Sequence, residues 1–325
     1  MHLRPLFVLL AVGASVCGLA ACSRREPTPS PVLAWAYPHA AKAPLPEAPP
    51  GPQHVPGSHL TFTQAQVSDD QNPPDWNPEE HALAPAVVVH GRAGGPTPCA
   101  ACHLFNGQGF IGAPNLAGLS AGYIVQQVQE FRSGRRVSSE HGRPATAEMI
   151  EVANKVSDAE LVKAASYYAA LPRRPWFRVV ETATVPATRP DYYGWLDLVP
   201  GAPGEPIGNR IIEVPEDMAR MTLSDPHSGV VVYVPPGSLA RGEALVRAGG
   251  HGSEPCSSCH AADLRGLDDT PPLAGRSPAY LARMLWDIKT GARHGPAVAA
   301  MQGPAGALSE TDIIDVAAYL ASLKP

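Results

Sequence analysis

The sequence predicts a mainly α-helical protein made of two similar small all-α domains, which are joined by an extended, partly β connector. Three observations support this fold class. Two stretches of the chain repeat each other, each repeat has helical apolar spacing, and the stretch between them is rich in Pro and Gly with short β-branched runs. A length of 325 residues suits two domains of about 100–150 residues with connections.

The internal repeat can be followed position by position. Over the first part of each copy, equivalent residues lie 157 positions apart, as Tyr123 and Tyr280 do. The second copy then becomes five residues shorter, so that equivalent residues lie 152 positions apart, as Ser157 and Ser309 do. Two units of similar build follow from this register.

Each repeat contains two predicted helices. The first covers 123–132 in one copy and 280–290 in the other, and a glycine follows each. The second begins at a serine with an acidic residue three positions later, which is a capping signal, at Ser157 and again at Ser309.

The connector, residues 173–237, has a different character. Short apolar runs at 177–180, 210–214 and 230–234 are separated by Pro- and Gly-rich turns, so we expect short strands there. A bare linker would not need such runs, and we therefore expect the connector to pack on one or both repeats.

One five-residue motif occurs in each repeat. Cys99-Ala100-Ala101-Cys102-His103 and Cys256-Ser257-Ser258-Cys259-His260 both read C-x-x-C-H. This motif is typical of covalent attachment of haem c, so two haem c groups are predicted. The predicted attachment residues are Cys99, Cys102, Cys256 and Cys259, and the predicted proximal iron ligands are His103 and His260.

Two other interpretations of the paired cysteines are weaker. The two pairs could share one tetrahedral zinc ion, or each could be a thioredoxin-like redox dithiol. Zinc does not require a histidine directly after both pairs, and no βαβ pattern surrounds either pair. Haem attachment is therefore the favoured interpretation.

The second axial ligand of each iron decides between electron transfer and chemistry at an open site. Met149 and Met301 match in the repeat, and each lies eight residues before the serine that begins the last helix. Methionine opposite histidine raises the reduction potential and fills the iron's sixth position. The alternatives are that both methionines fill gaps in a core, or that His141 and His294 are the ligands.

Each proximal histidine is followed eleven residues later by a proline, Pro114 or Pro271. A backbone carbonyl usually accepts the free ring N–H of a ligating histidine and fixes its tautomer, and we expect these prolines to provide it. Arg136 and Arg293 also match in the repeat. They either contact haem propionates or lie in solvent.

The N-terminus has the features of an export signal. Arg4 precedes an apolar run that extends to Ala21. The string Leu19-Ala20-Ala21-Cys22 resembles a bacterial lipobox, so residues 1–21 are predicted to be a signal peptide and Cys22 to carry lipid. Cleavage without lipidation is the alternative.

The predicted domain layout follows from these features. Residues 22–82 form a lipidated, Pro-rich tether, 83–172 the first domain, 173–237 the connector and 238–325 the second domain. The 37 prolines are about twice the average share and favour long extended connections.

The motif, the Pro-x-Leu segment, the methionine and the final Ser-capped helix of each repeat together resemble class I cytochromes c. Two in tandem resemble dihaem cytochrome c4-type proteins, over roughly 83–172 and 238–325. The resemblance implies the small all-α cytochrome c fold twice, His/Met iron ligation and electron transfer. The long tether and the insert at 173–237 depart from that pattern.

The predicted function is electron transfer in the bacterial periplasm by a lipid-anchored dihaem carrier. It would meet a redox donor and an acceptor in transient, charge-guided contacts. The alternatives are a dihaem oxidoreductase, either cytochrome c peroxidase-like or thiosulfate-oxidising, or a cytochrome subunit of a periplasmic dehydrogenase or oxidase. The matched methionines favour a carrier over an enzyme. A net charge of -5 and the lack of a basic stripe argue against nucleic-acid binding.

Overall fold

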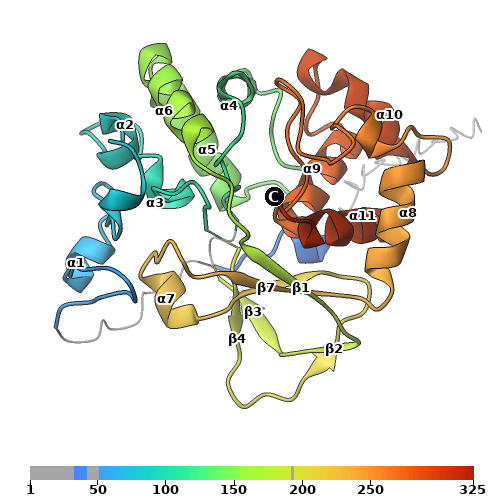
Figure 1. Ribbon diagram of the computed structural model, residues 1–325, viewed down its shortest axis with the longest axis horizontal. Helices are drawn as coiled ribbons and strands as arrows, with labels where there is room; N and C mark the ends of the chain where they lie inside the picture. Colours follow the sequence, from blue (N-terminus) through green and yellow to red (C-terminus); the bar gives the residue numbers. More distant parts are fainter. Residues whose placement is uncertain (1–32, 42–50, 111, 192–193) are drawn as a thin grey trace, which may run out of the picture. The chain divides into compact units, whose positions relative to one another are not determined.

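The computed structural model describes residues 33–41, 51–110, 112–191 and 194–325 (Figure 1). The predicted signal peptide and the predicted lipidation site, Cys22, lie outside these residues. Within the described ranges, no helix is both long and apolar enough to cross a membrane. The described chain is mainly helical with a smaller β region, which confirms the predicted fold class.

The first unit is built on three long helices. They are α4 (Ala121–Arg132), α5 (Pro144–Lys155) and α6 (Asp158–Ala170). Helices α4 and α6 confirm the two predicted from the sequence, whereas α5 was not predicted. Short helices precede them: α1 (Gln64–Val67), η2 (Pro78–Glu80), α2 (Ala86–Val89) and α3 (Ala100–His103).

The second unit repeats this plan. Helices α9 and α11 confirm the two predicted helices, and α8 and α11 lie side by side (Figure 1, right). Gly242 of α8 permits this close approach, because a Cβ there would lie 2.0 Å from the Asp315 carbonyl oxygen of α11. The elements are α8 (Ser238–Ala248), η3 (Cys256–Ser258), α9 (Pro278–Thr290), η4 (Pro296–Val298), α10 (Ala299–Ala307) and α11 (Glu310–Ser322).

Capping boxes begin the last helix of both units. The Ser157 hydroxyl accepts the Glu160 N–H, and the Glu160 carboxylate accepts the Ser157 N–H in return. Ser309 and Asp312 form the same reciprocal pair. The shorter aspartate side chain therefore makes the same capping hydrogen bond as the glutamate, and the two helices start at equivalent positions.

The connector contains a small sheet of three strands in the order β1-β7-β6. Strand β1 (Phe177–Glu181) runs parallel to β7 (Val230–Val234), and β6 (Ile212–Pro215) runs antiparallel to β7. These strands confirm the three predicted apolar runs. Two short pairs, β2 (Thr184–Val185) with β5 (Glu205–Pro206) and β3 (Thr188–Pro190) with β4 (Leu196–Leu198), and helix α7 (Met218–Thr222) complete it.

Parts of the segment predicted to be a solvated tether are packed against the folded units. Tyr37, beside the short helix η1 (Ala34–Ala36), is buried, and Val55 and Trp76 are also buried. The Trp76 Nε1–H donates to the Leu223 carbonyl at 2.6 Å. A few buried side chains, widely separated in the sequence, thus anchor this Pro-rich segment on the folded units.

The two helical units meet at a short backbone seam. Arg136 and Arg293, which are equivalent in the repeat, form an isolated antiparallel bridge. Two hydrogen bonds flank it: Val137 N–H donates to Ala292 O at 3.0 Å, and His294 N–H donates to Arg135 O at 2.9 Å.

Candidate functional site

The first C-x-x-C-H motif occupies the single helical turn α3. The His103 N–H donates to the Cys99 carbonyl at 2.9 Å, so the turn holds both ends of the motif together. The His103 ring is buried, and its Nδ1 lies 2.9 Å from the Pro114 carbonyl oxygen, which accepts the ring proton. Burial lowers the pKa of His103 to about 4. The ring is therefore neutral, with Nε2 free to bind a metal ion.

The second motif has the same geometry. The His260 N–H donates to the Cys256 carbonyl at 3.0 Å, and the ring Nδ1 lies 2.8 Å from the Pro271 carbonyl oxygen. His260 is also buried, and burial lowers its pKa. Both histidines are thus oriented as the sequence predicts for a proximal ligand.

The loops that follow the two histidines share one backbone frame. The Leu116 N–H donates to the Gly107 carbonyl at 2.8 Å, and the Leu273 N–H donates to the Leu264 carbonyl at 2.8 Å. Gly107 has φ 70° and Leu264 has φ 62°, so both adopt the left-handed region. Although only Gly107 is a glycine, the backbone follows the same course in both loops to the proline whose carbonyl contacts the histidine.

Three cysteine thiols of the motifs have raised pKa values. Burial raises the pKa of both Cys99 and Cys102 to about 12, and it raises the pKa of Cys256. Among the residues that the structure describes, no three His, Cys, Asp or Glu side chains come together as a metal site.

The predicted methionine ligands lie on two helices that the sequence analysis did not predict. Met149 lies on α5 and is partly buried. Met301 lies on α10 and packs against the apolar cluster of Ile288, Val298 and Ala305. Iron ligation by these methionines stays a prediction. The competing histidines, His141 and His294, are exposed.

Arg136 and Arg293 are buried at the seam rather than solvated. Both donate to the Gln127 Oε1, at 3.0 Å and 2.7 Å. Each also reaches across to a tyrosine hydroxyl of the other unit, Arg136 to Tyr280 at 3.3 Å and Arg293 to Tyr123 at 3.4 Å. Within the described residues, neither guanidinium forms an ion pair with a carboxylate.

Further buried guanidinium nitrogens lack a partner within the described part of the chain. They are Arg143 Nε, Arg173 Nη1, Arg276 Nη2 and Arg293 Nε. Burial opposes ionisation of Tyr280, yet the positive charges of Arg136, Arg293 and Arg276 lower its pKa. Buried positive charge with unused donors suits an anionic group. Each haem carries two propionates, so these residues fit a haem.

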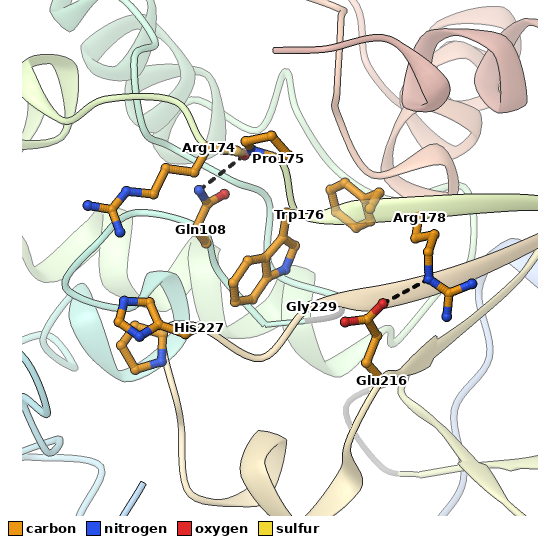
Figure 2. Close-up of a pocket in the computed structure, with 10 residues that line it drawn as sticks. Gln108, Arg174, Pro175, Trp176, Arg178, Glu216, His227 and Gly229 are labelled. Carbon is orange, nitrogen blue, oxygen red and sulfur yellow. Dashed lines mark hydrogen bonds and ion pairs between the residues drawn. The ribbon is translucent and has the colours of Figure 1, made fainter. Parts of the chain in front are cut away.

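A cavity of about 330 Å³ lies between the first unit and the connector and is separate from both motifs (Figure 2). Its polar side chains are already paired: the Gln108 Nε2 donates to the Arg174 carbonyl, and Arg178 lies 3.0 Å from Glu216. We therefore place no cofactor there.

Sequence analysis missed the residues that complete the seam. Gln127, Arg276 and Met284 were not singled out, although Met284 Sδ lies 3.5 Å from both Arg136 Nη2 and Arg293 Nη1. The equivalence of Tyr123 and Tyr280 in the repeat was visible. It gave no sign that each tyrosine contacts the other unit.

Comparison with known families decides what these paired motifs represent. The family described as "Cytochrome c" matches residues 95–171 and 239–324, which together make up half of the chain. The chain belongs to the cytochrome c family. Both matched regions contain one C-x-x-C-H motif and the proline that contacts its histidine.

Individual relatives agree with this assignment. A cytochrome c4 of Stutzerimonas stutzeri is 33% identical over 140 residues, which are 38% of this chain and 65% of that protein. A cytochrome c4 of Pseudomonas aeruginosa is 24% identical over 249 residues, 75% of this chain and 90% of that protein. A "Thiosulfate dehydrogenase electron acceptor" of Stutzerimonas stutzeri is 27% identical over 228 residues, 69% of this chain and 78% of that protein.

This cytochrome is therefore a dihaem c-type protein with two covalently bound haem c groups, and its function is to carry electrons. The prediction of a tandem, cytochrome c4-like protein is confirmed.

Proposed function

We propose that this cytochrome relays electrons between redox proteins of the bacterial envelope and is held at the membrane by lipid on Cys22. The observation that carries the proposal is the duplicated contact between a buried, neutral histidine and a proline carbonyl. Haem c supplies a one-electron couple at each site when bound. The chain's part is to attach it, through Cys99 and Cys102 in the first unit and through Cys256 and Cys259 in the second.

The proposed axial ligands are His103 with Met149 and His260 with Met301. Pro114 and Pro271 hold the two imidazoles as donors at Nδ1, which leaves Nε2 for the iron. A filled sixth position excludes added ligands and leaves outer-sphere electron transfer as the reaction.

The seam arginines would hold haem propionates. Arg136 and Arg293 are buried without a carboxylate partner among the described residues, and Arg276 and Arg143 have unused donors. Carboxylates from the haems would satisfy these donors and balance the charge.

The relative that accepts electrons from thiosulfate dehydrogenase suggests one donor class, a periplasmic sulfur-compound dehydrogenase. In this role the chain would be the acceptor subunit or the next carrier. A dihaem oxidoreductase, either cytochrome c peroxidase-like or thiosulfate-oxidising, would instead need one iron with an open position.

One spectroscopic experiment separates carrier from enzyme. Absorption spectra of the oxidised and the reduced holoprotein are recorded with and without CO. A carrier is expected to show two low-spin haems whose spectra do not change when CO is added. Stoichiometric CO binding to one haem would overturn the carrier assignment. In parallel, Met149→Ala is expected to abolish the far-red Met–Fe band of the first haem and to lower its potential, and an unchanged spectrum would show that Met149 is not a ligand.

The anchor has a separate test. Cys22→Ala is expected to move the holoprotein from the membrane fraction to the soluble fraction. Retention at the membrane would contradict lipidation at this position.

A further inference from the structure

The segments that follow the two haem motifs have opposite surroundings. Residues 104–110 and 261–267 are equivalent in the repeat and share the backbone frame described above. The first segment is almost entirely buried, whereas most of the second is exposed. Since the frames match, the difference comes from what packs against each segment.

The first segment is covered by the connector and by the N-terminal region. The His81 ring stacks on Phe105 with 5.6 Å between centroids, and the Phe110 ring lies 5.2 Å from that of Trp195. The Asn106 side chain donates to the Pro226 carbonyl at 2.7 Å. The segment itself has no charged residue.

The second segment is open, and residues 254–269 around it have four carboxylates and one arginine. Cys259 is exposed, whereas the equivalent Cys102 is partly buried. Exposed carboxylates precede and follow Cys259 in the sequence, at Glu254, Asp263 and Asp268. The cations of this region are the exposed Arg265 and the partly buried Arg173, which interacts electrostatically with Asp263. The thioether at Cys259 would join the second haem to a residue two positions before this segment.

An exposed apolar side chain lies among these charges. Leu267 is equivalent to Phe110 in the repeat, yet it is 62% exposed where Phe110 is paired with an indole ring. The Leu267 N–H and carbonyl both pair with Thr270, so the backbone that presents the side chain is held in place. An apolar centre with a charged rim is the usual composition of a transient protein interface.

We propose that redox proteins with a Lys- or Arg-rich surface dock on this acidic face, defined by Glu254, Cys259, Asp263, Leu267 and Asp268, and exchange electrons with the second haem there. The inference rests on the proposed function. Charge complementarity steers the encounter, and Leu267 excludes water from the contact. The first haem, whose equivalent face is covered, exchanges electrons with such partners more slowly.

The test uses the full-length holoprotein and a reduced, lysine-rich class I cytochrome c as the probe. Stopped-flow absorbance gives the second-order rate constant at low and at high salt. The double variant Asp263→Asn/Asp268→Asn is expected to lower this rate constant about five-fold at low salt, with the difference shrinking at high salt. Asparagine is nearly isosteric and tolerates the positive φ at Asp268.

The matched control removes the same amount of charge from the first unit and its cover. Glu79→Gln/Glu140→Gln changes two carboxylates that are outside the acidic face. We expect its rate constant to stay within about two-fold of the unmodified protein. Leu267→Ala is expected to slow the exchange at high salt as well, because its contribution is not screened.

Two outcomes overturn the docking face. An equal loss in both double variants would mean that only net charge matters, and no loss in Asp263→Asn/Asp268→Asn would mean that the probe docks elsewhere. Failure of the proposed function looks different: the unmodified protein would not exchange electrons with the cytochrome probe at all, although an uncharged hydroquinone reduces both haems.

Discussion

The two haem motifs share one backbone frame but not one environment. In the first unit, His103 is followed by a loop under cover of the connector and the N-terminal region. In the second, His260 is followed by an exposed, charged loop. The repeated fold orients the histidines, whereas segments outside the repeat decide which of the two sites other proteins can reach.

The starts of the equivalent helices α4 and α9 show the same contrast between exposed and buried surroundings. Ser120 caps α4 and donates to Asp269, which is exposed, at 2.6 Å. Ser277 caps α9 and donates to Glu213 of the connector, which is buried, at 2.9 Å. An identical cap thus has a solvated carboxylate in one unit and a desolvated one in the other.

The largest effect is expected from loosening the cover of the first unit. Trp76 is 1% exposed, and its ring stands edge-on to Phe62 at 4.7 Å. We expect Trp76→Ala to lower the free energy of unfolding by about 3–5 kcal/mol. Urea unfolding monitored at the haem bands measures this change.

The control for this variant is Trp76→Phe, which keeps a ring but loses the hydrogen bond to the Leu223 carbonyl. Its expected cost is about 1 kcal/mol. If Trp76→Ala cost no more than Trp76→Phe, the cover would not depend on this side chain.

A smaller effect is expected where the N-terminal segment meets both units. The Tyr37 hydroxyl donates to Asp287 of the second unit at 2.7 Å and accepts from the Ser139 hydroxyl of the first at 3.0 Å. Tyr37→Phe should lower the free energy of unfolding by about 1–2 kcal/mol. Thermal unfolding measures it, with Tyr233→Phe on β7 as the control. An equal loss of unfolding free energy in both variants would show that the hydrogen bonds among Tyr37, Ser139 and Asp287 contribute nothing specific.

The seam arginines lie where the two helical units meet. Positive charge favours the reduced haem, so Arg136→Gln and Arg293→Gln should each lower the reduction potentials. One charge acting with about 1 kcal/mol gives a shift on the order of 50 mV. Redox titration followed by absorbance measures it, with the exposed Arg178→Gln as control. Unchanged potentials in the seam variants would contradict propionate contact.

The smallest effect concerns the buried cap. Burial raises the pKa of Glu213 above its usual value, so the unfolded chain loses this proton at a lower pH than the folded protein. The stability that Glu213 gives is therefore complete below the unfolded pKa and falls as pH rises through the folded one. Glu213→Gln should match the stability of the unmodified protein near pH 4 and be more stable than it at pH 8.

Thermal unfolding across this pH range measures the difference. Asp269→Asn, which changes the exposed counterpart, is the matched control. If the two variants followed the same pH profile, burial of Glu213 would not be the cause.

The part of the fold encoded locally could be predicted from the sequence. Helices α6 and α11 are predictable because each has a capping serine at its start and an apolar face. Helix α5 was missed because Ala153 is its one buried residue, and α10 because Pro304 lies inside it. The packing of Val55 and Trp76 in the Pro-rich N-terminal segment was also missed, since it depends on single side chains with distant partners.

The candidate site divides in the same way. The motifs and the prolines after them were predictable, because each contact lies within eleven residues. The burial of Arg136 was not, because it depends on Tyr280 of the other unit. Contacts between repeats have no local signal, even when both partners match in the register.

The backbone seam between Arg136 and Arg293 has a consequence for how the protein is assembled. Arg136 meets its own repeat equivalent, and the two flanking hydrogen bonds are repeat equivalents of each other, which is the geometry of a two-fold symmetric homodimer. Joining the halves in one chain replaces association by folding at an effective concentration on the order of millimolar, so that a few hydrogen bonds suffice. A dimer of identical subunits would have to cover both haem faces or neither. The fused chain is free of that constraint, and it covers one face and leaves the other open.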